Sequence, residues 1–132
     1  MSIHAPAITA FYLMHVHKVS AVAITDAEGT LVANLSASDI RVSTIRIHKP
    51  TLQGFDATHF GELVEPCSTY LTKKYGKITP PITCEKKNSF ESVVTRLAQN
   101  RIHRMWIVDE KGCPTGVISL TDVMKKIADI VY

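Results

Sequence analysis

The chain has 132 residues, of which 45% are hydrophobic and 20% charged, values that are ordinary for a globular protein with one compact core. Its net charge of +3 comes from basic residues interspersed with acidic ones, which argues against nucleic-acid binding but permits one local anion site. No apolar run approaches the roughly 20 residues that span a bilayer, and the start lacks a signal-peptide pattern, so no membrane association is expected.

The first predicted element is a helix from Pro6 to Lys18, since proline suits a first helical turn. Strands are predicted over residues 19–25 and 30–35, on either side of a turn that contains Gly29, and another helix from Ser38 onward. The residues expected on the buried side of the first helix are Ile8, Phe11, Tyr12 and Val16.

A long connector covers residues 41–78. Its middle predicts two short helical stretches interrupted by Pro66, and Tyr70 and Leu71 are expected to pack in a core. The sequence Lys-Lys-Tyr-Gly-Lys at residues 73–77 is interpreted as a basic, solvated turn, with contact to a phosphate as the alternative.

The second half of the chain starts with an extended segment over residues 79–84 that leads into a helix. Asn88 is the expected N-cap of that helix, and Glu91 stands at the reciprocal capping-box position. The apolar residues that recur at helical spacing are Phe90, Val93, Val94 and Leu97.

Two strands and a helix complete this half. The strands are predicted over residues 104–108 and 116–119, with Gly112 at a positive φ in the turn between them. The closing helix is expected over residues 120–130, and Trp106 is interpreted as a core side chain rather than a base-stacking platform.

These two sets of elements are copies of one unit. Residues 18–40 (KVSAVAITDAEGTLVANLSASDI) align without a gap with residues 101–123 (RIHRMWIVDEKGCPTGVISLTDV). The identical pairs include Asp26 and Asp109, Gly29 and Gly112, Ser36 and Ser119, and Asp39 and Asp122. The repeat predicts two small units with a ligand held between them. Because Cys84 aligns with Met1, the first copy is expected to lack its leading strand, either as a fragment or with a partner supplying that edge.

The motif Ser-x-x-Asp occurs in both copies, as Ser36-Ala-Ser-Asp39 and Ser119-Leu-Thr-Asp122, where a strand ends and a helix begins. One interpretation is a capping box that only starts the helix. The other is a ligand site, because hydroxyls, free backbone N–H groups and a carboxylate meet there and an aspartate suits a ribose diol. The two interpretations are compatible.

The pair His103-Arg104 precedes a strand of the second copy, where the first copy has Ser20-Ala21. Arg104 offers a planar fork for a phosphate, and the alternative is an exposed strand entry without a ligand. No catalytic motif is present, and residues two apart in a helix, such as His15 and His17, do not share a metal ion easily, so neither catalysis nor metal binding is expected. The three cysteines are expected to be reduced thiols of a cytoplasmic or nuclear protein.

The stretch NRIHRMWIVDEKGCPTGVISLTDVMKKI, with its first-copy equivalent, resembles CBS domains, which occur in tandem as Bateman modules. The likeness is greatest to the regulatory gamma subunit of AMP-activated protein kinase and gamma-like proteins. It implies an α+β fold of two tandem units with pseudo-twofold symmetry, each a small three-stranded sheet packed on two helices. The expected boundaries are 1–48 for the first unit, 49–78 for the connector and 79–132 for the second unit.

The resemblance also implies two clefts for AMP, ADP or ATP between the units. In these clefts Asp39 and Asp122 hold the ribose, with help from nearby hydroxyls, and the other implied contacts involve phosphate, adenine and the lead-in strand. The implied ribose-side hydroxyls are those of Ser36, Ser38, Ser119 and Thr121. The implied phosphate contacts are His103 and Arg104, the implied adenine contacts are Val19, Ser20, Ala21 and Ile102, and Thr83 is the contact from the lead-in strand. The cleft that combines Asp39 with Thr83 is expected to be the more complete one.

The main hypothesis is therefore a non-catalytic adenine-nucleotide sensor that regulates a protein kinase or another effector. The alternative is a nucleotide-independent dimerisation module, and a small enzyme is a third, weaker hypothesis. Under both main hypotheses a homodimer completing a four-unit disc is expected.

Overall fold

The computed structural model describes residues 1–39 and 57–131. The first part of the predicted connector, and the helix predicted from Ser38 beyond residue 39, lie outside these residues. The chain divides into two compact units, the first containing residues 1–28 and 32–80 and the second residues 29–31 and 81–132. Each unit combines a small sheet with helices, so the expected α+β class is confirmed.

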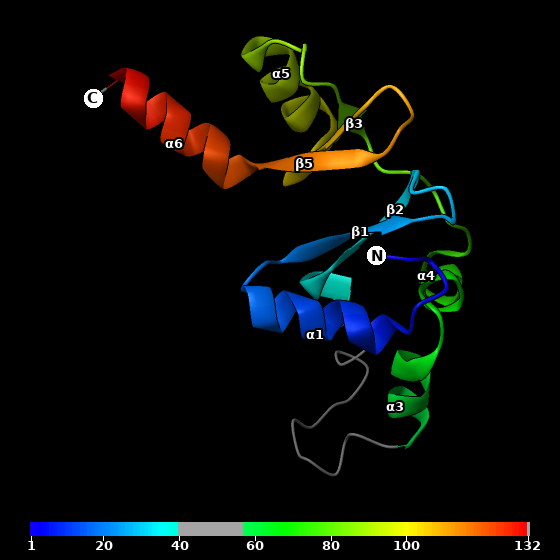
Figure 1. The fold of residues 1–132 in the computed structure, drawn as a ribbon. Helices are drawn as coiled ribbons and strands as arrows, with labels where there is room; N and C mark the ends of the chain where they lie inside the picture. The colour runs from blue at the N-terminus through cyan, green and yellow to red at the C-terminus, as the bar shows by residue number, and fades with distance from the viewer. Residues whose placement is uncertain (40–56, 132) are drawn as a thin grey trace. The chain divides into compact units, whose positions relative to one another are not determined.

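The first unit holds the elements of the first copy together with the described part of the connector (Figure 1). Its elements are α1 (Ala7–His17), β1 (Ala21–Thr25), β2 (Leu31–Ser36), α3 (Ala57–Val64) and α4 (Cys67–Tyr75). Residues 37–39 are helical and directly follow β2. The predicted helix and both strands are therefore confirmed to within a residue or two at most boundaries, and Pro66 separates α3 from α4 as expected.

The buried side of α1 differs from the expectation. Ala7, Ala10 and Met14 are buried, whereas Tyr12 is 64% exposed and Val16 49% exposed. The placement of Tyr12 and Val16 in the core was therefore wrong. Apolar residues surround most of the circumference of α1, so their spacing did not single out one face, and the two alanines allow close packing.

The core of the first unit joins the sheet to both connector helices. Its fully buried side chains include Ile24, Leu35 and Cys67, and Tyr70 and Leu71 pack there as predicted. Burial of an isoleucine or leucine side chain of this kind contributes about 1.5–3 kcal/mol. Backbone hydrogen bonds from Ala7 N–H to the Glu65 carbonyl and from Cys67 N–H to the Ala5 carbonyl, both 2.8 Å, fix the start of α4 beside the start of α1.

The sheet of the first unit has two named strands, β1 and β2, and its edge is lined by the first residues of the chain. Ser2 forms a parallel bridge with Thr25, the Thr25 N–H donates to the Met1 carbonyl and the Ile3 N–H donates to the Thr25 carbonyl, both at 2.8 Å. Residues 1–3 thus lie beside β1 at the edge where the second unit has its lead-in strand.

The second unit contains a three-stranded sheet with the strand order β3-β4-β5. Its elements are β3 (Thr83–Cys84), α5 (Phe90–Asn100), β4 (Arg104–Val108), β5 (Pro114–Ser119) and α6 (Leu120–Val131). The predicted lead-in segment is thus a short strand, parallel to β4. The core side chains of this unit are Cys84, Val93, Leu97, Met105 and Val123.

Two details of the second unit differ from expectation. The N-cap of α5 is Ser89, whose hydroxyl accepts the Ser92 N–H at 3.1 Å, while Asn88 accepts the Glu85 N–H and shapes the preceding turn. Serine and asparagine are equally good caps, so sequence alone did not separate two adjacent candidates. Trp106 is only partly buried, because in this strand the fully buried residue is Met105.

The repeated aspartate and glycine serve the same turn in both copies. Asp26 accepts the N–H of Glu28 through Oδ1 at 2.9 Å, and Asp109 accepts the N–H groups of Lys111 and Cys113 at the same distance. Gly29 and Gly112 have φ values of +84° and +80°, which confirms the positive φ predicted for Gly112. These identities of the repeat are therefore explained by turn geometry rather than by a ligand.

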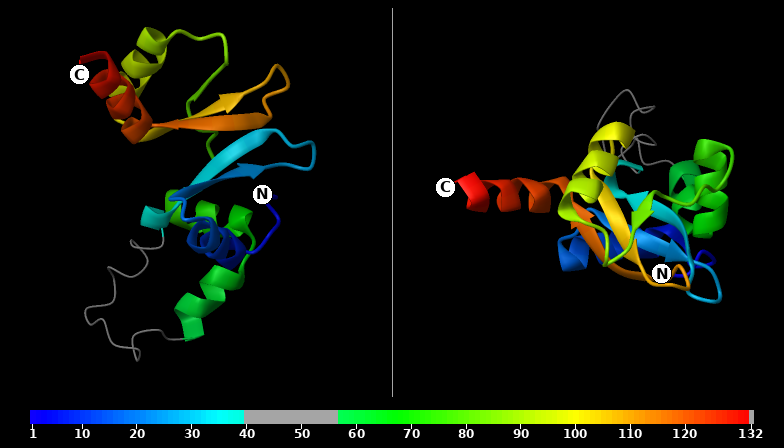
Figure 2. Two further views of the ribbon diagram at one scale, coloured as in Figure 1. Left: turned by 60° about the vertical axis from the view of Figure 1, so that its left-hand side comes forward. Right: turned by 90° about the horizontal axis from the view of Figure 1, so that it is seen from above.

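The last helix packs only partly on its own unit. It leaves the end of β5 and extends away from that sheet (Figure 2), and Val123 is its buried residue among those described. The large apolar side chains that stay exposed on α6 are Leu120, Met124, Ile127, Ile130 and Val131. Among the described residues, none of the helices has the length and apolar character that crossing a membrane requires.

Candidate functional site

Both Ser-x-x-Asp motifs lie where a strand ends and a helix begins, and both form a capping arrangement. The Ser36 N–H donates to Asp39 Oδ2 at 2.7 Å, and the Ser119 N–H donates to Asp122 Oδ2 at 2.8 Å. In the second copy the box is reciprocal, since the Asp122 N–H donates to Ser119 Oγ at 3.2 Å. The capping interpretation is confirmed, and each cap fixes a carboxylate beside a serine hydroxyl.

The same backbone hydrogen bond joins each motif to the start of the preceding strand of its unit. The Ala37 N–H donates to the Ser20 carbonyl at 2.9 Å, and the Leu120 N–H donates to the His103 carbonyl at 2.7 Å. In the first unit this places the sequence Val19-Ser20-Ala21 beside Ser36 and the carboxylate that follows it. Val19 and Ser20 are exposed there, as a ligand contact requires.

In the second unit the predicted phosphate and ribose groups meet at one edge. Arg104 begins β4 and is the direct pairing partner of Ser119, the last residue of β5. His103 is exposed immediately before that strand, and Asp122 follows within the first turn of α6. One strand pair and one helix start thus place Arg104, Ser119 and Asp122 at one edge of the unit, with His103 next to Arg104 in the chain.

The other predicted residues of this unit occupy neighbouring positions. Ile102 is partly buried at the edge of the core, and Thr121 is exposed in the first turn of α6. Thr83 pairs with Trp106 across β3 and β4, and its carbonyl accepts Nη1 of Arg96 at 2.9 Å. The hydrogen bond with Arg96 fixes the lead-in strand to α5.

Asp122 is exposed and has one oxygen available. Its Oδ2 accepts the N–H and the hydroxyl of Ser119, at 2.8 and 2.9 Å, and Oδ1 accepts no hydrogen bond from the described residues. The hydrogen bonds from the Ser119 N–H and the Ser119 hydroxyl both lower the pKa of Asp122, and the bond from the N–H has the larger effect. The carboxylate is therefore ionised at neutral pH and offers a charged acceptor to a ligand hydroxyl.

Asp39 is in a different environment, because it is only 3% exposed and both of its oxygens are engaged. Oδ2 accepts the Ser36 N–H and lies 3.3 Å from the Ser36 hydroxyl, which also lies 2.7 Å from the Ser38 hydroxyl. Oδ1 forms an ion pair with Lys74 Nζ at 3.2 Å and accepts a hydrogen bond from the hydroxyl of Tyr75.

The Asp39 backbone is bound to the same helix. Its carbonyl accepts the hydroxyl of Tyr70 at 3.2 Å and also the ammonium of Lys74. The Lys74 side chain is 13% exposed, so the interpretation of residues 73–77 as a solvated turn was wrong for this residue. Tyr75 is 59% exposed, but partial desolvation of its hydroxyl and, to a smaller extent, the hydrogen bond to Asp39 raise its pKa, so the phenol remains a donor at neutral pH.

Lys74 and Tyr75 are therefore site residues that the sequence did not identify. The signal was present, because Lys74 stands four residues after Tyr70 and three after Leu71, both of which were expected to be buried. Residues at these spacings share one face of a helix, so the side chain of Lys74 had to run along the core.

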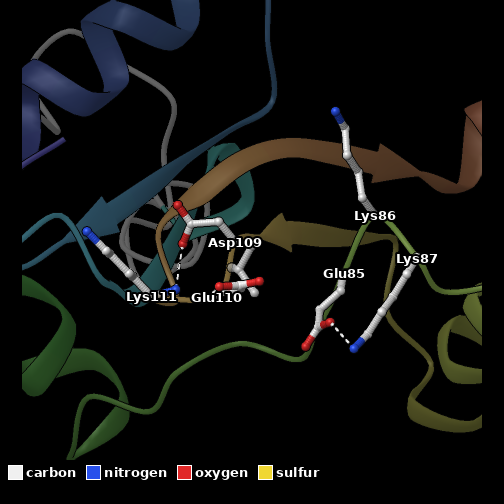
Figure 3. Close-up of a pocket in the computed structure, with 7 residues that line it drawn as sticks. Glu85, Lys86, Lys87, Asp109, Glu110 and Lys111 are labelled. Carbon is white, nitrogen blue, oxygen red and sulfur yellow. Dashed lines mark hydrogen bonds and ion pairs between the residues drawn. The ribbon is translucent and has the colours of Figure 1, made fainter.

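A shallow pocket of the second unit lies at the other end of β4 (Figure 3). Its lining residues are Glu85, Lys86, Lys87, Val108, Asp109, Glu110 and Lys111. Lys87 is paired with Glu85 at 3.1 Å, and Asp109 accepts backbone N–H groups of its own turn. Its charges are mixed and partly satisfied within the pocket, so it does not extend the candidate site.

Comparisons with known proteins agree with this geometry. Residues 76–129 match the CBS domain family. Protein SDS23 of Kluyveromyces lactis is 30% identical over 92% of this chain and 25% of that protein. The 5'-AMP-activated protein kinase subunit gamma of the same yeast is 28% identical over 83% of this chain and 30% of that protein. The chain thus spans about a quarter of the length of these relatives.

Among solved structures, CBSX2 in complex with AMP has a TM-score of 0.71 at 22% identity, covering 100% of this chain and 89% of that one. The repeated strand–helix units define a tandem α+β repeat module. In particular, the chain has the fold of a tandem CBS domain pair, and its second repeat is a CBS domain.

Proposed function

We propose that this chain is a non-catalytic regulatory module that binds adenine nucleotides through its two Ser-x-x-Asp junctions. The observation that carries the proposal is the meeting of Arg104, Ser119 and Asp122 at one edge of the second unit. The ionised carboxylate with an available oxygen matches a ribose diol, and the guanidinium of Arg104, the strand partner of Ser119, matches a phosphate. The AMP complex of the similarly folded CBSX2 supports this ligand class.

The proposed contacts follow the two equivalent junctions. Asp122 and Asp39 accept ribose hydroxyls, with the hydroxyls of Ser36, Ser38, Ser119 and Thr121 around them. The proposed phosphate contacts are His103 and Arg104, the proposed adenine contacts are Val19, Ser20, Ala21 and Ile102, and Thr83 contributes from the lead-in strand. By analogy with the kinase gamma subunit that it resembles, the module would pass nucleotide binding to a kinase or another effector in the cytoplasm or nucleus.

Isothermal titration calorimetry with AMP, ADP and ATP tests the proposal. We expect saturable binding that weakens in Asp122→Asn and in Arg104→Met. Asp129→Asn is the matched control, because it removes the same charge from an exposed aspartate on the same helix. The absence of binding heat for all three nucleotides at about millimolar concentration, well above a typical regulatory Kd, would refute the proposal.

A second function, nucleotide-independent dimerisation, is favoured by the exposed face of α6. Leu120, Met124, Ile127 and Val131 are spaced by three or four residues, so they share one side of the helix, and all are exposed. We propose that a homodimer completing a four-unit disc covers this face. Light scattering should show a dimer that Ile127→Asp converts to a monomer, while Lys126→Asp, which also places an aspartate at an exposed α6 position, leaves it intact. A dimer without any nucleotide binding would favour this function over the first.

A further inference from the structure

We propose that Lys74 and Tyr75 form a latch that closes the Asp39 junction, so that a ribose can reach its carboxylate only after the end of α4 has released it. The inference rests on the proposed function of the two junctions. It adds a residue pair that makes the two copies respond differently to the same ligand.

The contacts show that the latch occupies the atom a ligand needs. Lys74 Nζ lies 3.2 Å from Asp39 Oδ1, and the Tyr75 hydroxyl donates to the same oxygen. The other oxygen, Oδ2, is committed to Ser36, whose N–H it caps. A ribose hydroxyl also needs an acceptor, so ligand and latch compete for Oδ1.

Burial strengthens this competition. The side chains of Asp39 and Lys74 are 5% and 13% exposed, so water screens their attraction poorly. An ammonium is a stronger donor to a carboxylate than a neutral hydroxyl. Lys74 also donates to the Asp39 carbonyl, which aligns its ammonium with both acceptors of one residue. A nucleotide hydroxyl alone therefore does not displace the latch readily.

The second copy has no equivalent of the latch among the described residues. Asp122 is capped by Ser119 in the same way, but it is exposed and its Oδ1 accepts no hydrogen bond within that part of the chain. The two junctions therefore share a cap and differ in access. A first ligand should bind at Asp122, and binding at Asp39 should carry the additional cost of opening the latch.

The latch gives α4 two possible arrangements. Closed, the end of α4 is held at Asp39 by Tyr70, Lys74 and Tyr75. Open, Lys74 has solvent within reach, because Tyr75 and Gly76 beside it end the helix. Occupancy of the Asp39 junction would thus be coupled to the position of the α4 end, which is how a binding event could reach an effector.

Calorimetric stoichiometry with AMP tests the latch. The test uses a double variant, Lys74→Met with Tyr75→Phe. It keeps an aliphatic side chain at position 74 and an aromatic ring at position 75 but removes both hydrogen-bond donors to Asp39 Oδ1. We expect one tight site in the wild type, which weakens in Asp122→Asn. In the double variant we expect a second site that is on the order of tenfold tighter than any second site of the wild type. Adding Asp39→Asn should remove that gained site. Lys73→Met is the matched control, since Lys73 is an exposed neighbour paired with Glu65.

The outcomes separate the two proposals. One site that weakens in Asp122→Asn and stays single in the latch variants would overturn the latch and leave the proposed function standing. Two equal sites in the wild type would also overturn the latch alone. No binding in any variant, with folding confirmed by circular dichroism, would overturn both.

Discussion

The pairing of Asp39 with Lys74 makes a quantitative prediction about stability, independent of any ligand. Replacing Asp39 by alanine removes the acceptor of the buried Ser36 N–H and leaves the ammonium of Lys74 without its charge partner. An unsatisfied buried donor costs about 1–3 kcal/mol, and loss of one partner of a buried pair costs about 3–5 kcal/mol. Because the Lys74 side chain can move toward solvent, we expect a total near the lower end of the sum of these two costs, about 4 kcal/mol.

A double-mutant cycle isolates the pair. The variants are Asp39→Ala, Lys74→Met and the combination, with the free energy of unfolding measured by urea titration and far-UV circular dichroism. Once Lys74 is a methionine, the loss of Asp39 no longer strands a charge, so the combined cost should be smaller than the sum of the two by about 1–2 kcal/mol. The matched cycle at Lys73 and Glu65, where Lys73 is exposed, should show a smaller coupling.

The cycle has a clear contrary outcome. Additivity of Asp39→Ala and Lys74→Met within about 0.5 kcal/mol would show that the two side chains do not interact in solution. The latch would then lose its structural basis, whatever the nucleotide measurements show.

Two further predictions concern single positions. Gly112→Ala should lower the free energy of unfolding by about 1–2 kcal/mol, because alanine is strained at a φ of +80°. The control is Gly61→Ala within α3, where the added methyl group has open space around it. This control should be neutral or stabilising in the same denaturation assay. Partial desolvation of its hydroxyl and the hydrogen bond to Asp39 raise the pKa of Tyr75, so its contribution to stability is complete below about pH 10 and is lost as the pH rises through the folded-state pKa. The unfolding free energy of the wild type should therefore fall more steeply above pH 10 than that of Tyr75→Phe, and parallel pH curves would contradict this.

Most of the fold was predictable because the chain carries its unit twice. The gap-free alignment identified the strand–turn–strand–helix order, and the turn glycines were located by the demand for a positive φ. Elements with a one-sided pattern, such as α5 with buried Val93 and Leu97, were placed correctly, although Phe90, assigned to the same apolar face, is 44% exposed. The all-round apolar α1 was not, because spacing identifies a face only when the other faces are polar.

The candidate site was predictable in its local part only. The capping geometry of Ser119 and Asp122 follows from four adjacent residues, and the structure shows it as expected. The partners of Asp39 lie 35 and 36 positions away in the sequence, at Lys74 and Tyr75. No local sequence pattern links such distant positions. The expectation that the Asp39 cleft is the more complete one therefore did not take the contacts of Lys74 and Tyr75 into account.

The central claim, that the carboxylates of the two junctions bind a ribose diol, is tested most directly by removing the diol. The measurement is the ratio of the Kd values for 2′,3′-dideoxy-AMP and AMP, in the wild type and in Asp122→Asn. We predict that the wild type prefers AMP by roughly tenfold or more, the value of a hydrogen bond to a charged acceptor, and that the ratio falls toward one in Asp122→Asn. Equal Kd values for the two nucleotides in the wild type, or an unchanged preference for AMP in Asp122→Asn, would contradict the account.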